Sequence, residues 1–191
     1  DSGGARAERL EAPRERDLSR PKGHDEGRPI FFPNTEASGV VPQISAILGT
    51  CAGIAVYSPA LTDFIYMVDG ISHMFITGPR VIKSVMGEDI SFDELGGPNV
   101  HMQLSGVADF RVPSEDECFK HIRRLLGFLP SNHRQPAPVV ATNDDPLRLD
   151  DKLTEIVPPN PFTPFDVRLV IQRLVDNGDF LEVKPQFAAE M

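Results

Sequence analysis

The sequence of 191 residues is long enough to bury a hydrophobic core, and its length predicts one domain with room for part of a second. Hydrophobic residues make up 40% of the chain and charged residues 25%, which excludes wholesale disorder and a fibrous or membrane-inserted protein. The formal net charge of −9 offers no concentrated basic surface, so we expect no nucleic-acid partner. No stretch approaches the roughly 18 consecutive apolar residues that a membrane-spanning helix needs, so we expect no membrane insertion.

The first predicted segment, residues 1–33, is dominated by charge. Between Arg6 and Arg28, 13 of 23 residues are charged, seven basic and six acidic, and only two leucines could anchor the stretch. No helical or alternating apolar period runs through it. We therefore expect a solvated, disordered segment here, followed by a folded domain over residues 34–191.

Beyond the charged segment, short apolar runs alternate with glycine and proline, which is typical of a packed α/β domain. The sequence predicts strands over Pro42–Leu48, Phe64–Val68 and His73–Ile76. After the first strand, the small residues of Gly49–Gly53 predict a tight turn, from which a helix over Ala55–Leu61 begins.

A second predicted helix spans Pro79–Met86, with proline in the first turn and Gly87 at its end. Ser114 and Glu117 form a capping-box pattern ahead of a third helix. This helix carries an apolar stripe of Cys118, Ile122, Leu125, Leu126 and Leu129.

The rest of the chain begins with a region rich in proline, asparagine and aspartate, residues 130–160, which predicts a long surface connection. A last helix is expected over Pro164–Asp176, because Val167, Val170, Ile171 and Leu174 share one of its faces. Gly178 would end that helix, and Phe180–Val183 predicts a short strand.

The sequence gives little support for catalysis by side chains or for a metal site. The two cysteines, Cys51 and Cys118, stand 67 positions apart, and no histidine pair has the spacing of a zinc site, so we expect no metal. Two cysteines are too few for a disulfide framework, which is typical of a protein in a reducing compartment. We expect the cytoplasm in preference to the mitochondrial matrix. The histidine at position 101 has two open interpretations, a pocket residue or a structural histidine.

Two glycine-containing runs remain as candidate sites, DSGGAR (Asp1–Arg6) and GTCAG (Gly49–Gly53). Each is compatible with a turn in which the main chain comes close to another group. The second run stands between a predicted strand and a predicted helix. Because the first N–H groups of a helix have no partner inside it, this turn could bind a carbonyl or oxyanion oxygen. A purely structural turn is the alternative, and it is the more common use of such residues.

The run Ser38–Gly97 contains, in this order, the segments SGVVPQI, YSPALTDF, FITGP, VIKSV, GED and ELGG. In the order and spacing of these segments it resembles the carboxyltransferase (β) subunits of biotin-dependent acyl-CoA carboxylases, the propionyl-CoA carboxylase β family. Methylmalonyl-CoA decarboxylase and transcarboxylase subunits share its fold. Looser similarity continues to Met191, and Asp1–Arg6 matches the family's DSGGAR.

This resemblance implies a crotonase-like α/β domain, a spiral of ββα units, of which residues 34–191 would be the later part of an incomplete first domain. It implies transfer of a carboxyl group from carboxybiotin, carried by a partner subunit or domain, to the α-carbon of a propionyl-type acyl-CoA. The implied partners are the acyl-CoA, a biotin carboxylase and biotin carboxyl carrier subunit, and further copies of the chain, which form a hexamer in the family. A methylmalonyl-CoA decarboxylase or transcarboxylase subunit and a non-catalytic fragment remain alternatives.

The family's CAGGA motif maps onto Cys51–Ala55, so the resemblance implies that the N–H groups of Gly53 and Ile54 are the catalytic donors to the thioester oxygen. The substrate-binding residues in the same interpretation are Gly3, Gly4, Cys51, Ala52, Tyr57 and Gly78.

Three features depart from the family pattern. Ile54 stands where the family has a second glycine, and residues 7–33 do not resemble the family's loop. The chain also stops before the family's second domain, which supplies the oxyanion hole on the biotin side. We therefore expect the chain alone to be inactive.

Overall fold

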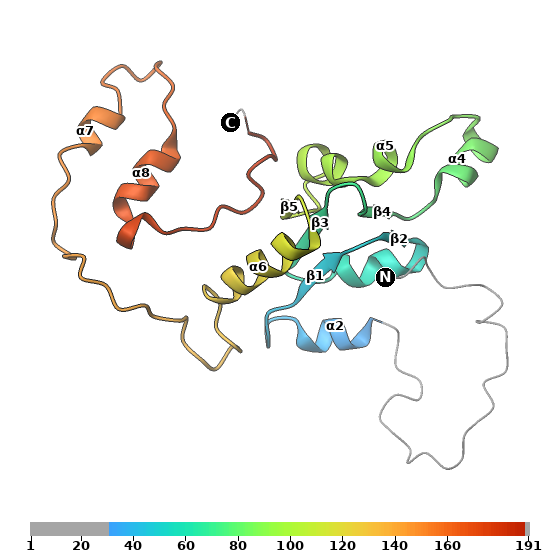
Figure 1. Cartoon of the computed structure of the whole chain (residues 1–191), viewed down its shortest axis with the longest axis horizontal. Coiled ribbons are helices and arrows are strands. Elements are labelled where there is room, and N and C mark those ends of the chain that lie inside the picture. The colour runs from blue at the N-terminus through green and yellow to red at the C-terminus, as the bar shows by residue number, and fades with distance from the viewer. Residues whose placement is uncertain (1–30, 190–191) are drawn as a thin grey trace, which may run out of the picture. The chain divides into compact units, whose positions relative to one another are not determined.

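The computed structural model describes residues 31–189 (Figure 1). The chain divides into two compact units. The larger unit contains the described residues up to 137 together with those from 183 onward, and the smaller unit is Pro138–Glu182. The charged segment and its expected disorder lie outside the described residues, apart from the last three positions, 31–33.

The larger unit is built on a parallel sheet of three strands, β1 (Ile44–Ile47), β3 (Phe64–Val68) and β5 (Phe110–Val112), in the order β1-β3-β5. The central strand β3 is the most deeply buried, since its last four residues are at most 4% exposed. Such burial is expected of a parallel strand that is covered on both faces, and it explains the unbroken apolar run FIYMV.

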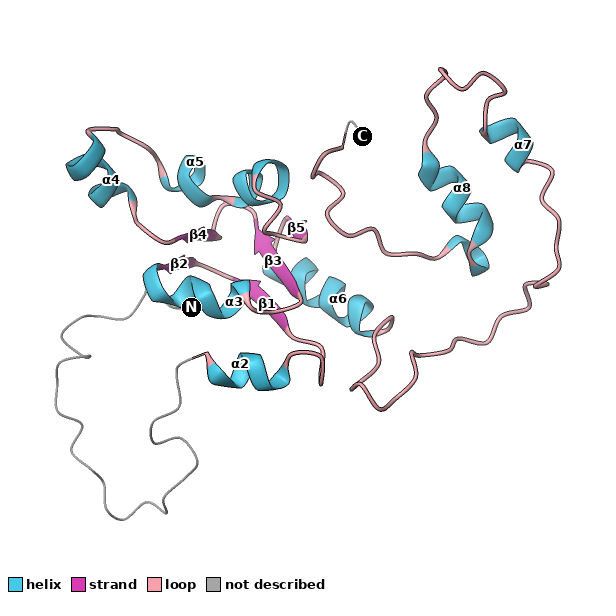
Figure 2. Cartoon of the chain, turned by 180° about the vertical axis from the view of Figure 1, so that it is seen from behind, coloured by secondary structure: helices cyan, strands magenta, loops and turns pink. Residues whose placement is uncertain are grey.

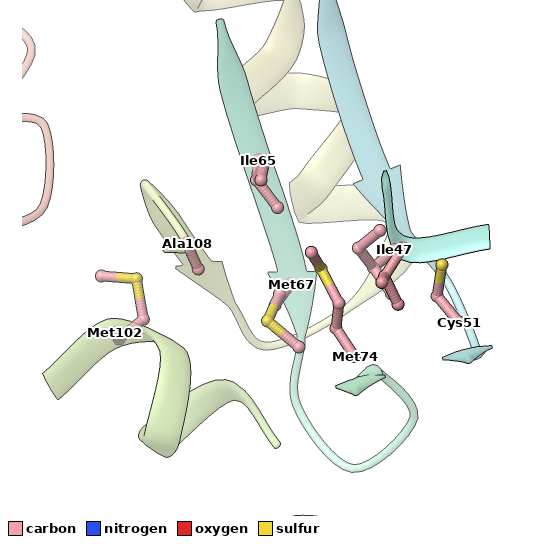
Figure 3. Close-up of a cluster of buried hydrophobic side chains, with 8 residues drawn as sticks. Ile47, Cys51, Ile65, Met67, Met74, Met102 and Ala108 are labelled. Atoms are coloured by element: carbon pink, nitrogen blue, oxygen red, sulfur yellow. The ribbon is translucent and has the colours of Figure 1, made fainter. Parts of the chain in front are cut away.

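A second parallel sheet pairs β2 (Thr50–Ala52) with β4 (His73–Phe75), in a register that places Cys51 beside Met74. The two sheets share one hydrophobic core. Figure 3 shows side chains from β1, β2, β3 and β4 gathered in this core, among them those of Ile47, Cys51 and Met67. The buried Ser72 hydroxyl links the strands further, because it accepts from the N–H of Val68 at 2.6 Å and donates to the carbonyl of Ile47.

The predicted helices of this unit are confirmed, except that the third ends at Leu126 and leaves Leu129 of its predicted stripe outside the helix. A 3₁₀ turn, η1 (Gly53–Val56), leads directly into α3 (Tyr57–Ala60), and α4 (Pro79–Met86) ends at Gly87, which has φ +76°. Helix α6 (Glu115–Leu126) begins where the side chain of Ser114 accepts from the N–H of Glu117, and it packs against β3 and β5 (Figure 1).

Two predicted elements are wrong in detail. Gly49–Gly53 is more than a turn, because Thr50–Ala52 forms strand β2 once β4 is present as its partner. Phe180–Val183 forms no strand, and no strand within residues 31–189 pairs with it. Apolar runs of three or four residues become strands only where a neighbour satisfies their backbone, and sequence alone does not show that neighbour.

Several short elements were not predicted from the sequence. They are α2 (Phe32–Ala37), α5 (Phe92–Gly96), the π-helical turn η2 (Val100–Leu104), β5, and α7 (Leu153–Ile156). For one of them, α5, the sequence contains a helix-start pattern that could have been recognised. The Ser91 side chain accepts from the N–H of Glu94, and the Glu94 carboxylate accepts from the N–H of Ser91 at 3.0 Å, which is a complete capping box.

The smaller unit contains α7, α8 (Val167–Leu174) and the 3₁₀ turn η3 (Asp176–Gly178). A loop joins α7 to α8 (Figure 2), whereas η3 follows α8 after Val175. The predicted last helix is confirmed with narrower bounds, because the Asp166 side chain caps it by accepting from the N–H of Arg168 at 2.9 Å. None of the helices within residues 31–189 combines the length and the apolar character that crossing a bilayer requires.

Candidate functional site

The candidate oxyanion donors lie where β2 ends and η1 begins. Ala52 is extended, with φ −133° and ψ 155°, whereas Gly53 adopts φ +63° and Ile54 is the second residue of η1. Because the first N–H groups of a helix have no acceptor within it, this junction can offer hydrogen-bond donors to a ligand oxygen. The sequence predicted a turn that ends at Gly53 and a helix from Ala55, whereas in the structure the helical turn already begins at Gly53.

Conformation, rather than crowding, requires glycine at position 53. A Cβ atom there would lie 4.0 Å from its nearest neighbour, the carbonyl oxygen of Ile76, which is ordinary contact. The positive φ is what an L-residue would resist. The neighbouring side chain of Ile54 is 39% exposed, so an apolar group lies at the surface directly beside the two amides.

A cavity of about 200 Å³ lies beside this junction. Its lining comes from residues 45–51 together with Ala55 and Pro59, so Cys51 faces the cavity, whereas Gly53 and Ile54 are not part of the lining. Burial raises the pKa of the Cys51 thiol above its usual value. A neutral, buried thiol is a poor nucleophile, so Cys51 contributes shape to the cavity rather than reactivity.

The other substrate-binding residues expected from the sequence are placed as follows. Tyr57 begins α3, directly after η1, and its half-exposed ring packs on Phe31 with ring centroids 5.7 Å apart. Gly78 precedes α4 and follows Ile76 by two residues, at the end of the chain segment that approaches Gly53. Gly3 and Gly4 lie outside the described residues.

His101 is a residue whose role the sequence left open. Both of its ring nitrogens have partners, the carbonyl oxygen of Met74 at 2.6 Å and the hydroxyl of Ser105 at 2.9 Å. It is thus a hydrogen-bonded histidine in contact with β4. No group of three or more histidine, cysteine or acidic residues within 31–189 is arranged to hold a metal ion.

Comparison with known proteins gives consistent matches. Residues 22–191 match the family model of the carboxyl transferase domain. The chain is 57% identical over 162 residues to methylmalonyl-CoA decarboxylase subunit alpha of Veillonella parvula, covering 85% of this chain and 32% of that protein. It is 55% identical over 159 residues to the propionyl-CoA carboxylase carboxyltransferase subunit of Haloferax mediterranei, covering 83% and 31%.

A solved structure agrees with these sequence matches. The transcarboxylase 12S structure with methylmalonyl-coenzyme A and methylmalonic acid bound is 50% identical and superposes with a TM-score of 0.80, over 83% of this chain and 31% of that one. The chain therefore spans about a third of the length of the relatives it matches.

Proposed function

Because the chain belongs to the carboxyl transferase domain family, we propose that it is part of the carboxyltransferase component of a biotin-dependent acyl-CoA carboxylase. The resemblance predicted from the sequence is confirmed by the family match, and the crotonase-like α/β fold by the structural agreement with transcarboxylase 12S. The reaction, the substrate and the partners of the whole protein are proposals, since this chain spans about a third of its relatives.

The observation that carries the proposal is the TM-score of 0.80 at 50% identity with a protein solved with methylmalonyl-coenzyme A bound. Two relatives above 50% identity are named for propionyl-CoA and methylmalonyl-CoA, which differ by one carboxyl group on the α-carbon. A short acyl chain on coenzyme A is the feature that these names share. We therefore propose a propionyl-type acyl-CoA as the substrate class.

In this proposal the backbone amides of Gly53 and Ile54 bind the thioester oxygen of the acyl-CoA. Removing a proton from the α-carbon moves negative charge onto that oxygen, so donors aimed at it stabilise the enolate. One such donor contributes about 3 kcal/mol to a transition state of this kind. Cys51, Ala52, Tyr57 and Gly78, together with Gly3 and Gly4 of the N-terminal segment, are proposed to border the bound acyl-CoA.

Biotin belongs to a partner in this proposal. Carboxybiotin, when bound, would supply the carboxyl group that the α-carbon takes up, and we assign no residue within 31–189 to hold it. The proposed partners are a biotin carboxylase with its carrier and further copies of the chain, since the related transcarboxylase 12S structure is described as a hexamer assembly. We place the reaction in the cytoplasm.

A methylmalonyl-CoA decarboxylase subunit is the second candidate, because the chain is 57% identical to such a subunit from Veillonella parvula. Both candidates use the same enolate and differ in the direction of carboxyl flow. A non-catalytic fragment that binds acyl-CoA without turning it over is the third.

One assay series separates the three candidates. The chain is mixed with a biotin carboxylase, its biotinylated carrier, ATP and labelled bicarbonate, and incorporation of label into propionyl-CoA is measured. Loss of carboxylate from methylmalonyl-CoA is measured in parallel, and direct binding of each acyl-CoA by calorimetry. Labelled product supports the carboxylase, decarboxylation alone supports the decarboxylase, and binding without either reaction supports the fragment. Absence of binding to both acyl-CoAs overturns the proposal for this chain.

A further inference from the structure

The side chain of His101 reaches from the π-helical turn η2 to the backbone of β4. Its Nε2 lies 2.6 Å from the carbonyl oxygen of Met74, and its Nδ1 lies 2.9 Å from the hydroxyl of Ser105. A carbonyl oxygen can only accept, so Nε2 carries the hydrogen, and in the neutral ring Nδ1 accepts from Ser105. The Ser105 oxygen also accepts from the N–H of Val107 at 3.3 Å, which fixes the hydroxyl.

Strand β4 in turn holds the chain that leads into Gly53. The register pairs Met74 with Cys51 and Phe75 with Ala52, and Gly53 is the next residue. A sheet of two short strands is marginal by itself, so its geometry depends on what is packed against it. Any shift of the Met74 carbonyl therefore reaches the amides of Gly53 and Ile54 through the paired backbone.

Helix α5 and the turn η2 both contact β4, and they do so in different ways. Helix α5 supplies the ring of Phe92, whose centroid lies 5.5 Å from that of His73 and 5.4 Å from that of Phe75. Asp93 of the same helix places its Oδ1 3.1 Å from Nε2 of His73, so these contacts of α5 are made to side chains of β4. The hydrogen bond from His101 is directional and is made to the backbone of β4, so it determines where the Met74 carbonyl points. A π-helical turn such as η2 is often found at functional positions.

We propose that His101 is a positioning residue for the acyl-CoA site, a role that rests on the proposed function. By holding the Met74 carbonyl, the imidazole sets the place of β4, and through β2 it sets the direction of the Gly53 and Ile54 amides. His101 itself touches neither the substrate nor the reacting atoms.

Two substitutions separate this role from a general contribution to folding. His101→Gln puts an amide donor near the position of Nε2 and keeps the hydrogen bond to Met74. His101→Asn puts its amide near the position of Nδ1, where it can reach Ser105 but not Met74. Tyr66→Phe is the stability control, because it also removes one side-chain hydrogen bond, the 2.9 Å contact with His121, in the three-stranded sheet and not in the sheet of β4.

The full chain is studied by two-dimensional NMR of its backbone amides and by calorimetric titration with propionyl-CoA. We expect His101→Asn to move the Gly53 and Ile54 resonances and to weaken binding about tenfold, the factor that one hydrogen bond of ordinary strength represents. His101→Gln should restore both the Gly53 and Ile54 resonances and the affinity for propionyl-CoA. Tyr66→Phe should leave both unchanged, although it lowers the melting temperature about as much as His101→Asn does.

Each other outcome has a defined meaning. Equal effects of His101→Asn and His101→Gln, or the same loss of affinity in Tyr66→Phe, overturn the positioning role. If the unchanged chain does not bind propionyl-CoA, the proposed function fails instead, and the amide resonances still test the role of His101. Unmoved Gly53 and Ile54 resonances in a folded His101→Asn chain overturn that role as well.

Discussion

The backbone of Gly96 lies directly against the carbonyl of Met74, so that a Cβ atom at position 96 would be 2.1 Å from the carbonyl oxygen. No real Cβ approaches an oxygen so closely, and the obstacle is backbone that cannot rotate away. Glycine is therefore required here by space, in contrast to Gly53, where it is required by φ. The contact fixes how closely α5 can approach β4.

We expect Gly96→Ala to destabilise the protein by about 1–3 kcal/mol or more, because α5 must move away from Met74. This loss opposes the gain of about 1 kcal/mol that alanine brings over glycine inside a helix. Urea unfolding measures the difference. Gly127→Ala is a milder control, since its Cβ would lie 3.1 Å from the nearest oxygen, and equal stability of the two variants would contradict the contact.

A second prediction concerns Asp109, a buried carboxylate in a loop that leads into β5. Its Oδ2 accepts from the N–H of Ile65 at 2.7 Å, and its Oδ1 lies 3.1 Å from Nζ of Lys184. Asp109→Ala leaves the Ile65 N–H and the lysine without this partner, which should cost about 1–3 kcal/mol. Asp109→Asn keeps an acceptor oxygen and should cost less in urea unfolding. If the two variants lose the same stability, the bond to Ile65 is unimportant.

His121 links stability to pH. Its Nδ1 lies 2.9 Å from the Tyr66 hydroxyl, and burial, with a smaller effect of Arg124, lowers the pKa of the imidazole below its usual value. The folded protein thus favours the neutral ring, and between the lowered pKa and about 6.5 the unfolded chain binds more protons. The neutral His121 ring therefore adds to the free energy of unfolding above a pH of about 6.5, and this contribution is lost as the pH falls through the pKa of the folded state.

The measurement is urea unfolding at several pH values from about 7.5 down to 5. We expect the stability of the unchanged chain to fall over this range more steeply than that of His121→Gln, which has no titrating ring. Tyr66→Phe serves as the control, because it keeps the ring and should keep most of the slope. Parallel pH profiles for the unchanged chain and His121→Gln would show that the imidazole is not linked to folding.

The elements that the sequence predicted well are those whose signal is local. Pro79–Met86 carries proline at its start and glycine at its end, and Phe64–Val68 is an unbroken apolar run, so both bounds agree with the structure. Strand β2 and strand β5 were missed, because three residues become a strand only through a partner distant in the chain.

In the candidate site too, the local features were predictable from the sequence and the contacts between distant residues were not. The order strand, small residues, helix was visible around Gly53, and it placed the two amides at the junction between the turn and the helix. The hydrogen bond between His101 and Met74 was not visible in the sequence, because it joins residues 27 positions apart. Their proximity depends on how α5 and η2 fold over β4. The spacing of His101 in the sequence says nothing about that distance.

The central claim, that the backbone at Gly53 binds the thioester oxygen of an acyl-CoA, is tested most directly by a matched pair of glycine substitutions. Gly53→Ala and Gly70→Ala each place a Cβ at similar positive φ, +63° and +72°, and neither Cβ would meet an atom closer than 4.0 Å. The strain of the two substitutions should therefore be similar, about 1–2 kcal/mol. Calorimetric titration with propionyl-CoA should show affinity unchanged in Gly70→Ala and reduced about tenfold or more in Gly53→Ala, whose amide must turn away from the ligand. Equal affinity of the two variants would contradict the claim.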